Sequence, residues 1–304
     1  MKFDTPEIIS SIKRSTLYKV SQPQQNHQMS DKDLENVIHC KDFFPSTETV
    51  TFGQKKNLDN GSSRVPLKYD GNQLWMMSYK HRNPFGLSRG MPNSENYGKK
   101  LMCSLSFDRR SNRGKAFYDA MKQFEEVLIQ TAYEKRVEWG LCLAAESAET
   151  TERDIRKMFN RMIRVAKDKE GNPIEVYEPT FRVEFNVTKD ESTGLVNGVR
   201  TEVYNERQEK VDPVDESTIP MGSEAKCIMG APHVYVQPGK SFGVTWKLHQ
   251  LRVFPGSRLP TGRCLIRDDP EDSSDDEPAD NSSNPVPSDE DSSSPSRPKL
   301  SLRS

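Results

Sequence analysis

Aromatic and basic side chains alternate closely in one segment of the sequence, a combination suited to contact with nucleic acid. Bases stack on exposed aromatic rings, at about 1–3 kcal/mol per base, while Lys and Arg bind the phosphates of a single strand. Within residues 68–89 the candidates for these contacts are three rings and four cations: Trp75, Tyr79, Phe85, Lys68, Lys80, Arg82 and Arg89.

A second cluster of the same type lies further along the chain, and a row of basic residues extends it. Most aromatic residues on strands belong to the core and not to a binding surface. Trp246 is in phase with Val244 and Leu248, which favours the core for its ring, whereas the neighbours of Trp75 fix no face. The cluster and its extension comprise Tyr235, Lys240, Trp246, Lys247, Arg252, Arg161, Arg164 and Lys167.

The second cluster is positioned by a predicted β-hairpin, around which the chain is organised. Gln237-Pro238-Gly239-Lys240 predicts its turn, because Pro presets φ and the following Gly accepts a positive φ. Alternation of apolar and polar residues predicts three strands, at 224–229, 233–236 and 242–248.

The apolar pattern of the returning strand shifts by one position after Gln250. Leu248 lies at an even position, whereas Leu251 and Val253 lie at odd positions. A continuous strand can accommodate this shift only through a bulge or a bend, as small barrels do at their corners. The shift therefore favours a barrel.

The first half of the body combines short strands with one long helix. Apolar residues from Phe117 to Ala132 recur every three to four positions, which predicts an amphipathic helix over 113–139. Asp70-Gly71 predicts a tight turn. Strands are predicted at 49–53, 65–69, 74–79, 101–107 and 181–187.

Two further elements are predicted from the same patterns. A second helix is expected from Thr151 or Glu152 to Ala166, with one apolar and one strongly basic side. A strand over 199–204 is expected to pair back onto the strand at 181–187. The expected fold class is therefore mainly β with α insertions (α+β).

Charge divides the chain into a basic body and an acidic tail. The 304 residues have a net charge of −1, but residues 268–304 contain 11 acidic and three basic residues, which leaves residues 1–267 with a charge of +7. We expect a flexible arm over 1–40, a folded domain over 41–267 and a disordered tail over 268–304, because the two ends contain few core-forming residues.

A tethered polyanion can occupy a basic groove when DNA is absent, since its effective concentration is of order millimolar. A solubilising role is the simpler alternative for the tail. Three serines in it precede acidic residues and are hypothetical phosphorylation sites that would deepen its charge: Ser273, Ser274 and Ser288.

The sequence nominates no catalytic or metal site. Gly239-Lys240-Ser241 imitates the end of a phosphate-binding loop, but Val234 stands where the first glycine of that motif would be. The five histidines and five cysteines show no metal-ligand spacing. We therefore expect a non-enzymatic protein without cofactor or metal, with reduced thiols, no membrane segment and a soluble intracellular location.

Several blocks of the sequence together resemble a known protein family, over about residues 44–266. They are 65–69, 83–87, 105–107, 116–118, 179–181 and the most specific block, 240–250 (Lys-Ser-Phe-Gly-Val-Thr-Trp-Lys-Leu-His-Gln). The family is that of the OB-fold single-stranded DNA-binding proteins of large eukaryotic DNA viruses, akin to acidic-tailed phage replication proteins.

The resemblance implies an OB-type β-barrel, sequence-tolerant binding of single-stranded DNA, and tail contacts with a DNA polymerase or other replication proteins. It places the protein in DNA replication, repair or recombination, in the nucleus or at a viral replication site. The phage relatives end in an aromatic residue, whereas this chain ends at Ser304, so any tail occupying the groove would be Asp268–Asp291.

Two alternatives from other classes stay open. An RNA-binding module would prefer RNA through contacts with 2′-hydroxyls. A structural or protein-interaction protein would use the same sheet for protein contacts. The oligomeric state, including a homodimer, is not determined by the sequence.

Overall fold

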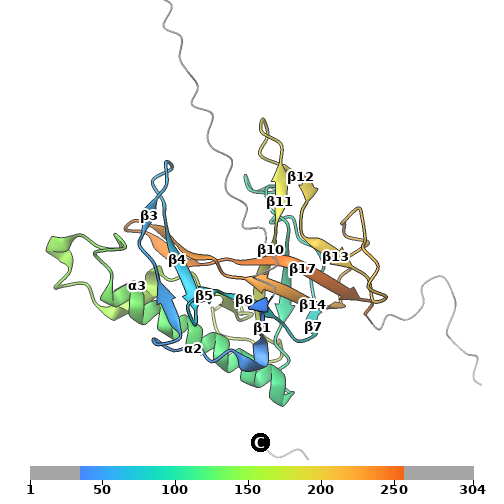
Figure 1. Cartoon of the computed structure of the whole chain (residues 1–304), viewed down its shortest axis with the longest axis horizontal. Coiled ribbons are helices and arrows are strands. Elements are labelled where there is room, and N and C mark those ends of the chain that lie inside the picture. Colours follow the sequence, from blue (N-terminus) through green and yellow to red (C-terminus); the bar gives the residue numbers. More distant parts are fainter. Residues whose placement is uncertain (1–34, 257–304) are drawn as a thin grey trace, which may run out of the picture. The chain divides into compact units, whose positions relative to one another are not determined.

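The computed structural model describes residues 35–256, which form a mainly β fold with helices along one side (Figure 1). The expected fold class, mainly β with α insertions, is confirmed. The helical segments within this range are α2 (Asn112–Glu134), α3 (Glu152–Met158) and two short 3₁₀ turns, η1 (Cys40–Asp42) and η2 (Ala144–Glu146).

Five strands close into a barrel. Each pairs with the next around the ring, and β14 closes the ring by pairing antiparallel with both β7 and β17. The barrel strands, in the order around the ring, are β7 (His81–Asn83), β8 (Met102–Ser106), β10 (Thr180–Phe185), β17 (Trp246–Phe254) and β14 (Ser223–Gly230).

The order of these strands is that of an OB-type barrel. Numbered along the chain from one to five, the barrel strands follow the ring order one, two, three, five, four, and the third and fifth run parallel. A five-stranded Greek-key barrel of this kind binds ligands across its second and third strands and between two loops. Here those loops are Pro84–Leu101 (loop 1–2) and Ala231–Thr245 (loop 4–5).

Short strands extend the barrel sheet on its outer edges. β6 pairs with the end of β14, β1 pairs with β6, β9 pairs with β10, and β13 pairs with β17. A separate hairpin, β11–β12, stands beside the barrel. Their bounds are β1 (Ile38–His39), β6 (Trp75–Met77), β9 (Ile163–Arg164), β11 (Val187–Lys189), β12 (Val196–Val199) and β13 (Glu202–Tyr204).

Loop 4–5 contains the predicted hairpin, which joins the barrel to a second sheet. Its turn residue Gly239 has φ +64°, as the turn chemistry predicts. One hairpin strand also pairs with β4, whose own turn at Asp70-Gly71 is confirmed by two positive φ values. The strands of this sheet are β2 (Val50–Phe52), β3 (Lys56–Asn57), β4 (Ser63–Tyr69), β5 (Asn72–Gln73), β15 (His233–Gln237) and β16 (Ser241–Val244).

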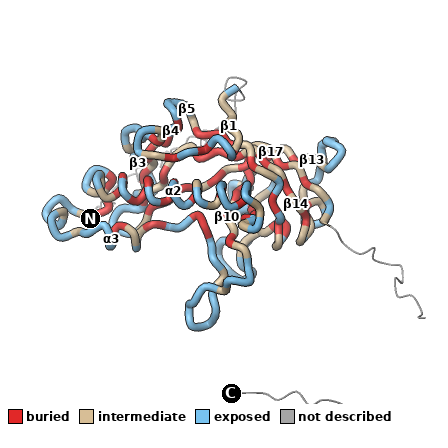
Figure 2. The backbone as a smooth tube through the Cα atoms, turned by 90° about the horizontal axis from the view of Figure 1, so that it is seen from below, coloured by how far each residue is buried: buried red, intermediate tan, exposed pale blue. Residues whose placement is uncertain are grey.

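Helix α2 covers the core on one side, as its periodicity predicts. Its buried residues lie on the inner face, and exposed positions gather on the outer face and the loops (Figure 2). Phe117 contacts Phe181 of the barrel at 5.7 Å between ring centroids, and Phe124 contacts Trp246 at 5.9 Å. Gly114 in the first turn is required, because a Cβ there would lie 2.0 Å from the carbonyl oxygen of Asp108.

The second helix is shorter than predicted. It begins at Glu152 behind a capping box on Thr151, but it ends at Met158 and not at Ala166. Beyond it the chain is extended, and β9 pairs with β10. The prediction of a basic helical side over residues 159–166 is therefore wrong, because tertiary partners override the local pattern.

The predicted bulge in the returning strand is confirmed. Ile228 pairs with Gln250 and Met229 pairs with Leu248, so His249 is the extra residue of β17. The strand predicted at 199–204, expected to pair with the strand at 181–187, is only partly correct. Val199 does pair with Val187, but residues 202–204 form β13, which pairs with β17.

Several expectations fall on residues that the structure does not describe. The arm before residue 35 and the tail with Ser273, Ser274 and Ser288 lie outside the described range. The domain limits at residues 40 and 267 stay predictions.

Candidate nucleic-acid interface

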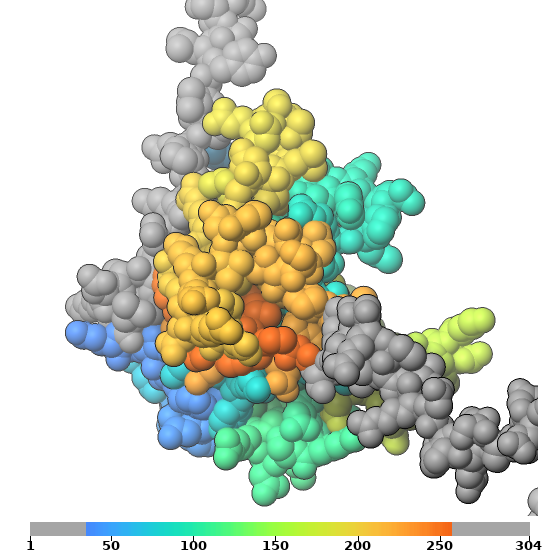
Figure 3. Space-filling model, turned by 90° about the vertical axis from the view of Figure 1, so that its right-hand side faces the viewer, coloured from blue at the N-terminus to red at the C-terminus, as the bar shows by residue number. Residues whose placement is uncertain are grey.

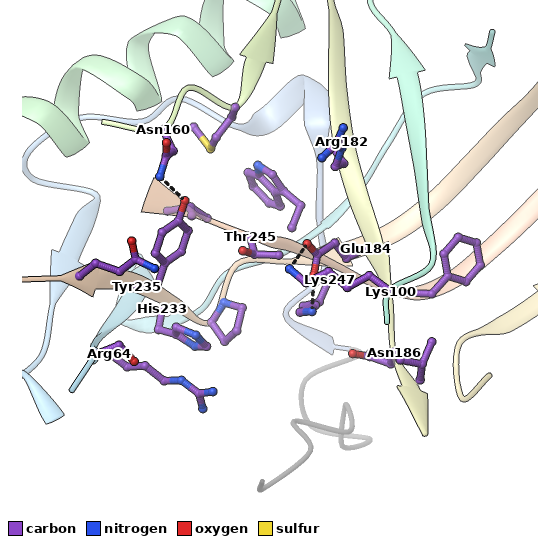
Figure 4. A pocket seen from close by; sticks show the side chains of 18 of the residues that line it. Arg64, Lys100, Asn160, Arg182, Glu184, Asn186, His233, Tyr235, Thr245 and Lys247 are labelled. Atoms are coloured by element: carbon purple, nitrogen blue, oxygen red, sulfur yellow. Dashed lines mark hydrogen bonds and ion pairs between the residues drawn. The ribbon is translucent and has the colours of Figure 1, made fainter. Parts of the chain in front are cut away.

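A groove with a volume of about 770 Å³ lies between the barrel and the second sheet (Figure 4). Loop 4–5 and β4 line one side, and β10, β11 and the end of loop 1–2 line the other. Residues 160–164, which follow α3, close one end. The groove thus runs along the third barrel strand between loop 1–2 and loop 4–5, the two loops that frame the ligand site of five-stranded Greek-key barrels.

The lining of the groove is strongly basic. Glu184 is its one acidic residue, against eight basic residues: Arg64, Lys99, Lys100, Arg161, Arg164, Arg182, Lys189 and Lys247. Five of the eight form no salt bridge with any residue in the described range: Arg64, Lys99, Arg164, Arg182 and Lys189. A concave surface of one sign concentrates ligands of the opposite charge.

Glu184 lies on β10 and binds two of the lysines. Its carboxylate accepts from Lys247 Nζ at 2.7 Å and from Lys100 Nζ at 3.0 Å. Burial opposes ionisation, but the two ammonium groups outweigh it and lower the pKa of Glu184. The carboxylate therefore stays charged and holds both lysines at the groove surface.

Arg182, two residues earlier on the same strand, has no such partner. Its Nε is buried and makes no hydrogen bond with the described residues. Burial lowers the pKa of Arg182, and the nearby charge of Arg164 lowers it further. Arg182 and Arg164 both line the groove without a salt bridge to any described residue, which suits them to bind a phosphate.

Tyr235, on β15, is the half-buried aromatic ring of the groove. Its hydroxyl accepts from Asn160 Nδ2 at 2.9 Å, and burial raises its pKa, so the phenol stays neutral. Gly243 on the neighbouring strand makes room for it, because a Cβ there would lie 2.9 Å from the hydroxyl oxygen. The ring is thereby fixed in orientation before any ligand binds.

Trp75 and Trp246 form part of the groove floor, but their rings are core residues. They are only 2% and 1% exposed. Gly230 packs directly on Trp75, where a Cβ would lie 2.5 Å from Cε3. An aromatic residue that stacks on a base must expose a face of its ring, and neither tryptophan does so.

The structure divides the residues singled out in the sequence. Arg161, Arg164, Tyr235 and Lys247 line the groove with the two tryptophans. Outside the groove, Lys80 pairs with Glu224 at 2.7 Å, Arg89 pairs with Glu216 at 2.7 Å, and Arg252 lies over the ring of Phe254. The remaining residues outside it are Lys68, Tyr79, Arg82, Phe85, Lys167 and Lys240.

Sequence reasoning missed five of the eight basic residues of the groove. Arg182 alternates with buried Phe181 and Val183, which signals an outward side chain on a strand. Lys99 and Lys100 lie two and three positions after Tyr97, a small aromatic and basic group that the clusters predicted from the sequence do not include. The other missed basic residues are Arg64 and Lys189.

No group of three or more His, Cys, Asp or Glu residues within 35–256 could hold a metal ion. Helices in the same range are too short or too polar to cross a membrane.

Comparisons with known proteins give limited similarity. No family model matches the chain, and neither does any curated protein. A solved structure of gp2.5, a single-stranded DNA-binding protein encoded by bacteriophage T7, has 13% identity and a TM-score of 0.36, and the match covers 62% of this chain and 91% of the phage protein.

The single-stranded DNA-binding protein from bacteriophage Enc34, in complex with single-stranded DNA, has 12% identity and a TM-score of 0.34, with 73% of this chain and 99% of the phage protein covered. Both TM-scores are below 0.5, so these two structures carry no conclusion about the function of this chain.

Proposed function

We propose that this protein binds single-stranded DNA in the basic groove, with little dependence on base sequence and without catalysis. The observation that supports this most is the lining of eight basic residues and one acidic residue at the ligand-binding position of an OB-type barrel. Such grooves follow the phosphates of a single strand, and phosphates are common to all sequences.

The size of the groove favours a single strand. A volume of about 770 Å³ is in the range of a drug-sized ligand, so the groove accommodates on the order of two nucleotides at a time. Arg182 and Arg164 would hold one phosphate and Lys100 and Lys247 a neighbouring one. A duplex, with its bases stacked inside, would present only its backbone to this groove.

DNA is preferred over RNA in this proposal because block 240–250 resembles the viral single-stranded DNA-binding proteins. A role in replication, repair or recombination follows from that resemblance, at the nucleus or a viral replication site. In this proposal the acidic residues within Asp268–Asp291 compete with DNA for the groove, and once displaced they bind a replication partner such as a DNA polymerase.

The test is a fluorescence-anisotropy titration of the full chain against single-stranded DNA, duplex DNA and RNA of equal length. Arg182→Gln should weaken binding to single-stranded DNA roughly tenfold, because it removes a charged hydrogen-bond donor at a phosphate. Lys115→Gln, on the exposed side of α2, removes the same charge outside the groove and should change affinity less than about twofold.

Binding should also weaken steeply as salt rises, because each phosphate contact releases counterions. Equal effects of the two substitutions would show that the body is merely attracted to polyanions. Stronger binding to RNA would favour the RNA-binding alternative.

A further inference from the structure

Two loops beside the lysine-rich end of the groove expose a tyrosine and a leucine. Tyr97, in loop 1–2, is 46% exposed, and Leu195, in the turn between β11 and β12, is 44% exposed. The two segments lie side by side on one face of the molecule, loop 1–2 in teal and the β11–β12 hairpin in yellow (Figure 3).

Backbone contacts join the two loops at this point. Val196 N donates to the carbonyl oxygen of Gly98 at 2.9 Å. Gly98 has φ +73°, and a Cβ there would lie 3.3 Å from Leu195 Cδ2, so the leucine side chain lies against the backbone next to Tyr97. The Asp190 carboxylate accepts from the backbone N–H of Thr193 at 2.8 Å, which fixes the turn before Leu195.

This surface is continuous with the groove. Lys99 and Lys189, on the same two segments, both line the groove. Burial lowers the pKa of Lys189, and the charges of Lys100 and Lys247 lower it further, as expected for lysines gathered at one end.

The surface around Tyr97 and Leu195 is not basic, since Glu95 and Glu191 are exposed on the same loops. Stacking by a base suits it better than contact with a phosphate.

We propose that a base of the strand leaving the groove stacks on a platform formed by Tyr97 and Leu195, so that the binding site extends beyond the groove. This inference rests on the proposed function. Its ligand is an unpaired nucleobase, held by an aromatic ring and an aliphatic side chain without recognition of sequence.

The test compares two oligothymidylates, of about 3 and about 18 nucleotides, since the groove accommodates about two nucleotides whereas sites on one OB barrel range over roughly 4–16. Tyr97→Ala in the full chain should weaken binding of the longer oligonucleotide about tenfold and leave the shorter one unchanged. Tyr97→Phe, which keeps the ring, should bind both like the wild type. Tyr177→Ala, at an exposed tyrosine of the loop between β9 and β10, is the matched control and should have no effect.

If Tyr97→Ala lost affinity equally for both oligonucleotides, Tyr97 would belong to the groove contacts. If it lost affinity for neither, Tyr97 would lie outside the binding site. Each result would overturn the platform. If the wild-type chain bound neither oligonucleotide, the proposed function itself would fail, which is a different outcome from a failure of Tyr97 alone.

Discussion

His81 is a buried histidine at the start of barrel strand β7, and it is held neutral. Its ring lies 5.3 Å from Phe181 and 5.5 Å from Phe117, between ring centroids. Nδ1 lies 3.1 Å from the carbonyl oxygen of Ser106, which identifies it as the protonated nitrogen. Burial lowers the pKa of His81 to about 4.

This histidine should make the folded state sensitive to acid. Above pH 6.5 it is neutral in both the folded and the unfolded chain. Between about pH 6.5 and pH 4 the unfolded chain binds a proton that the folded chain does not, so the free energy of unfolding falls as pH falls, by on the order of 3 kcal/mol in all.

Urea unfolding at pH 7.5, 6.5 and 5.0 measures this loss. In His81→Phe the new ring packs among the surrounding phenylalanines and cannot titrate. The free energy of unfolding of this variant should therefore decrease less over the same pH range. An identical decrease in the variant and the wild type would assign the acid sensitivity to other groups.

Glu125, on the buried side of α2, ties the segment after α3 to the core. Its Oε1 accepts from the backbone N–H groups of Met162 at 2.7 Å and Ile163 at 3.0 Å. In the helix predicted for this segment, the same N–H groups would instead donate to backbone carbonyl oxygens four residues earlier. Burial raises the pKa of Glu125, although the two backbone donors oppose the rise.

Glu125→Ala should lower the free energy of unfolding by roughly 2–4 kcal/mol, because it leaves two buried N–H groups without an acceptor. It should also weaken DNA binding, since Arg161 and Arg164 lie on the same segment. Glu125→Gln keeps one acceptor oxygen and should cost less.

Glu126→Gln, at the exposed neighbouring position, is the control and should change stability by less than about 1 kcal/mol. Urea unfolding measures all three variants. A cost for Glu125→Ala no larger than that of the control would mean that the segment is held by other contacts.

Helices α2 and α3 and the two tight turns show which elements can be predicted from the sequence and which cannot. The long helix, the turn at Asp70-Gly71 and the hairpin turn at Gly239 follow from local chemistry, so periodicity and turn residues predict them. The end of α3 depends on Glu125, about 35 positions earlier, and on pairing with β10. No local pattern contains those partners.

At the scale of the whole molecule, the groove is assembled from segments far apart in the chain. Its basic residues range from Arg64 to Lys247, on the barrel sheet, the second sheet, the β11–β12 hairpin and two connecting segments. The sequence clusters follow proximity along the chain, so they include Lys247 and Arg164, which line the groove, but not Arg182 and Lys100, which line it too. Barrel closure decides which cations share a surface, and closure is a property of the complete fold.

The opposite charges of body and tail lead to a prediction at this scale. Removal of residues 268–304 should tighten binding to single-stranded DNA by roughly three- to tenfold at low salt, because a competitor at millimolar effective concentration is lost. The difference should shrink as salt screens the charges.

A full-length variant with the 11 acidic residues of 268–291 changed to Asn or Gln separates charge from length, and anisotropy titrations measure it. It should bind like the truncated chain. Unchanged affinity in both would leave the tail as a partner-binding segment or spacer.

Barrel strand β17 is the last to be synthesised, and it pairs with both β10 and β14. A ribosome working at about 5–20 residues per second needs roughly 3–12 s to pass from the end of β10 at Phe185 to the start of β17 at Trp246. Throughout that interval β10 lacks one neighbour, and an unpaired strand edge attracts other chains. Nascent copies on the same messenger RNA are therefore exposed to mutual β-pairing until β17 emerges, and the cell must keep them apart until then.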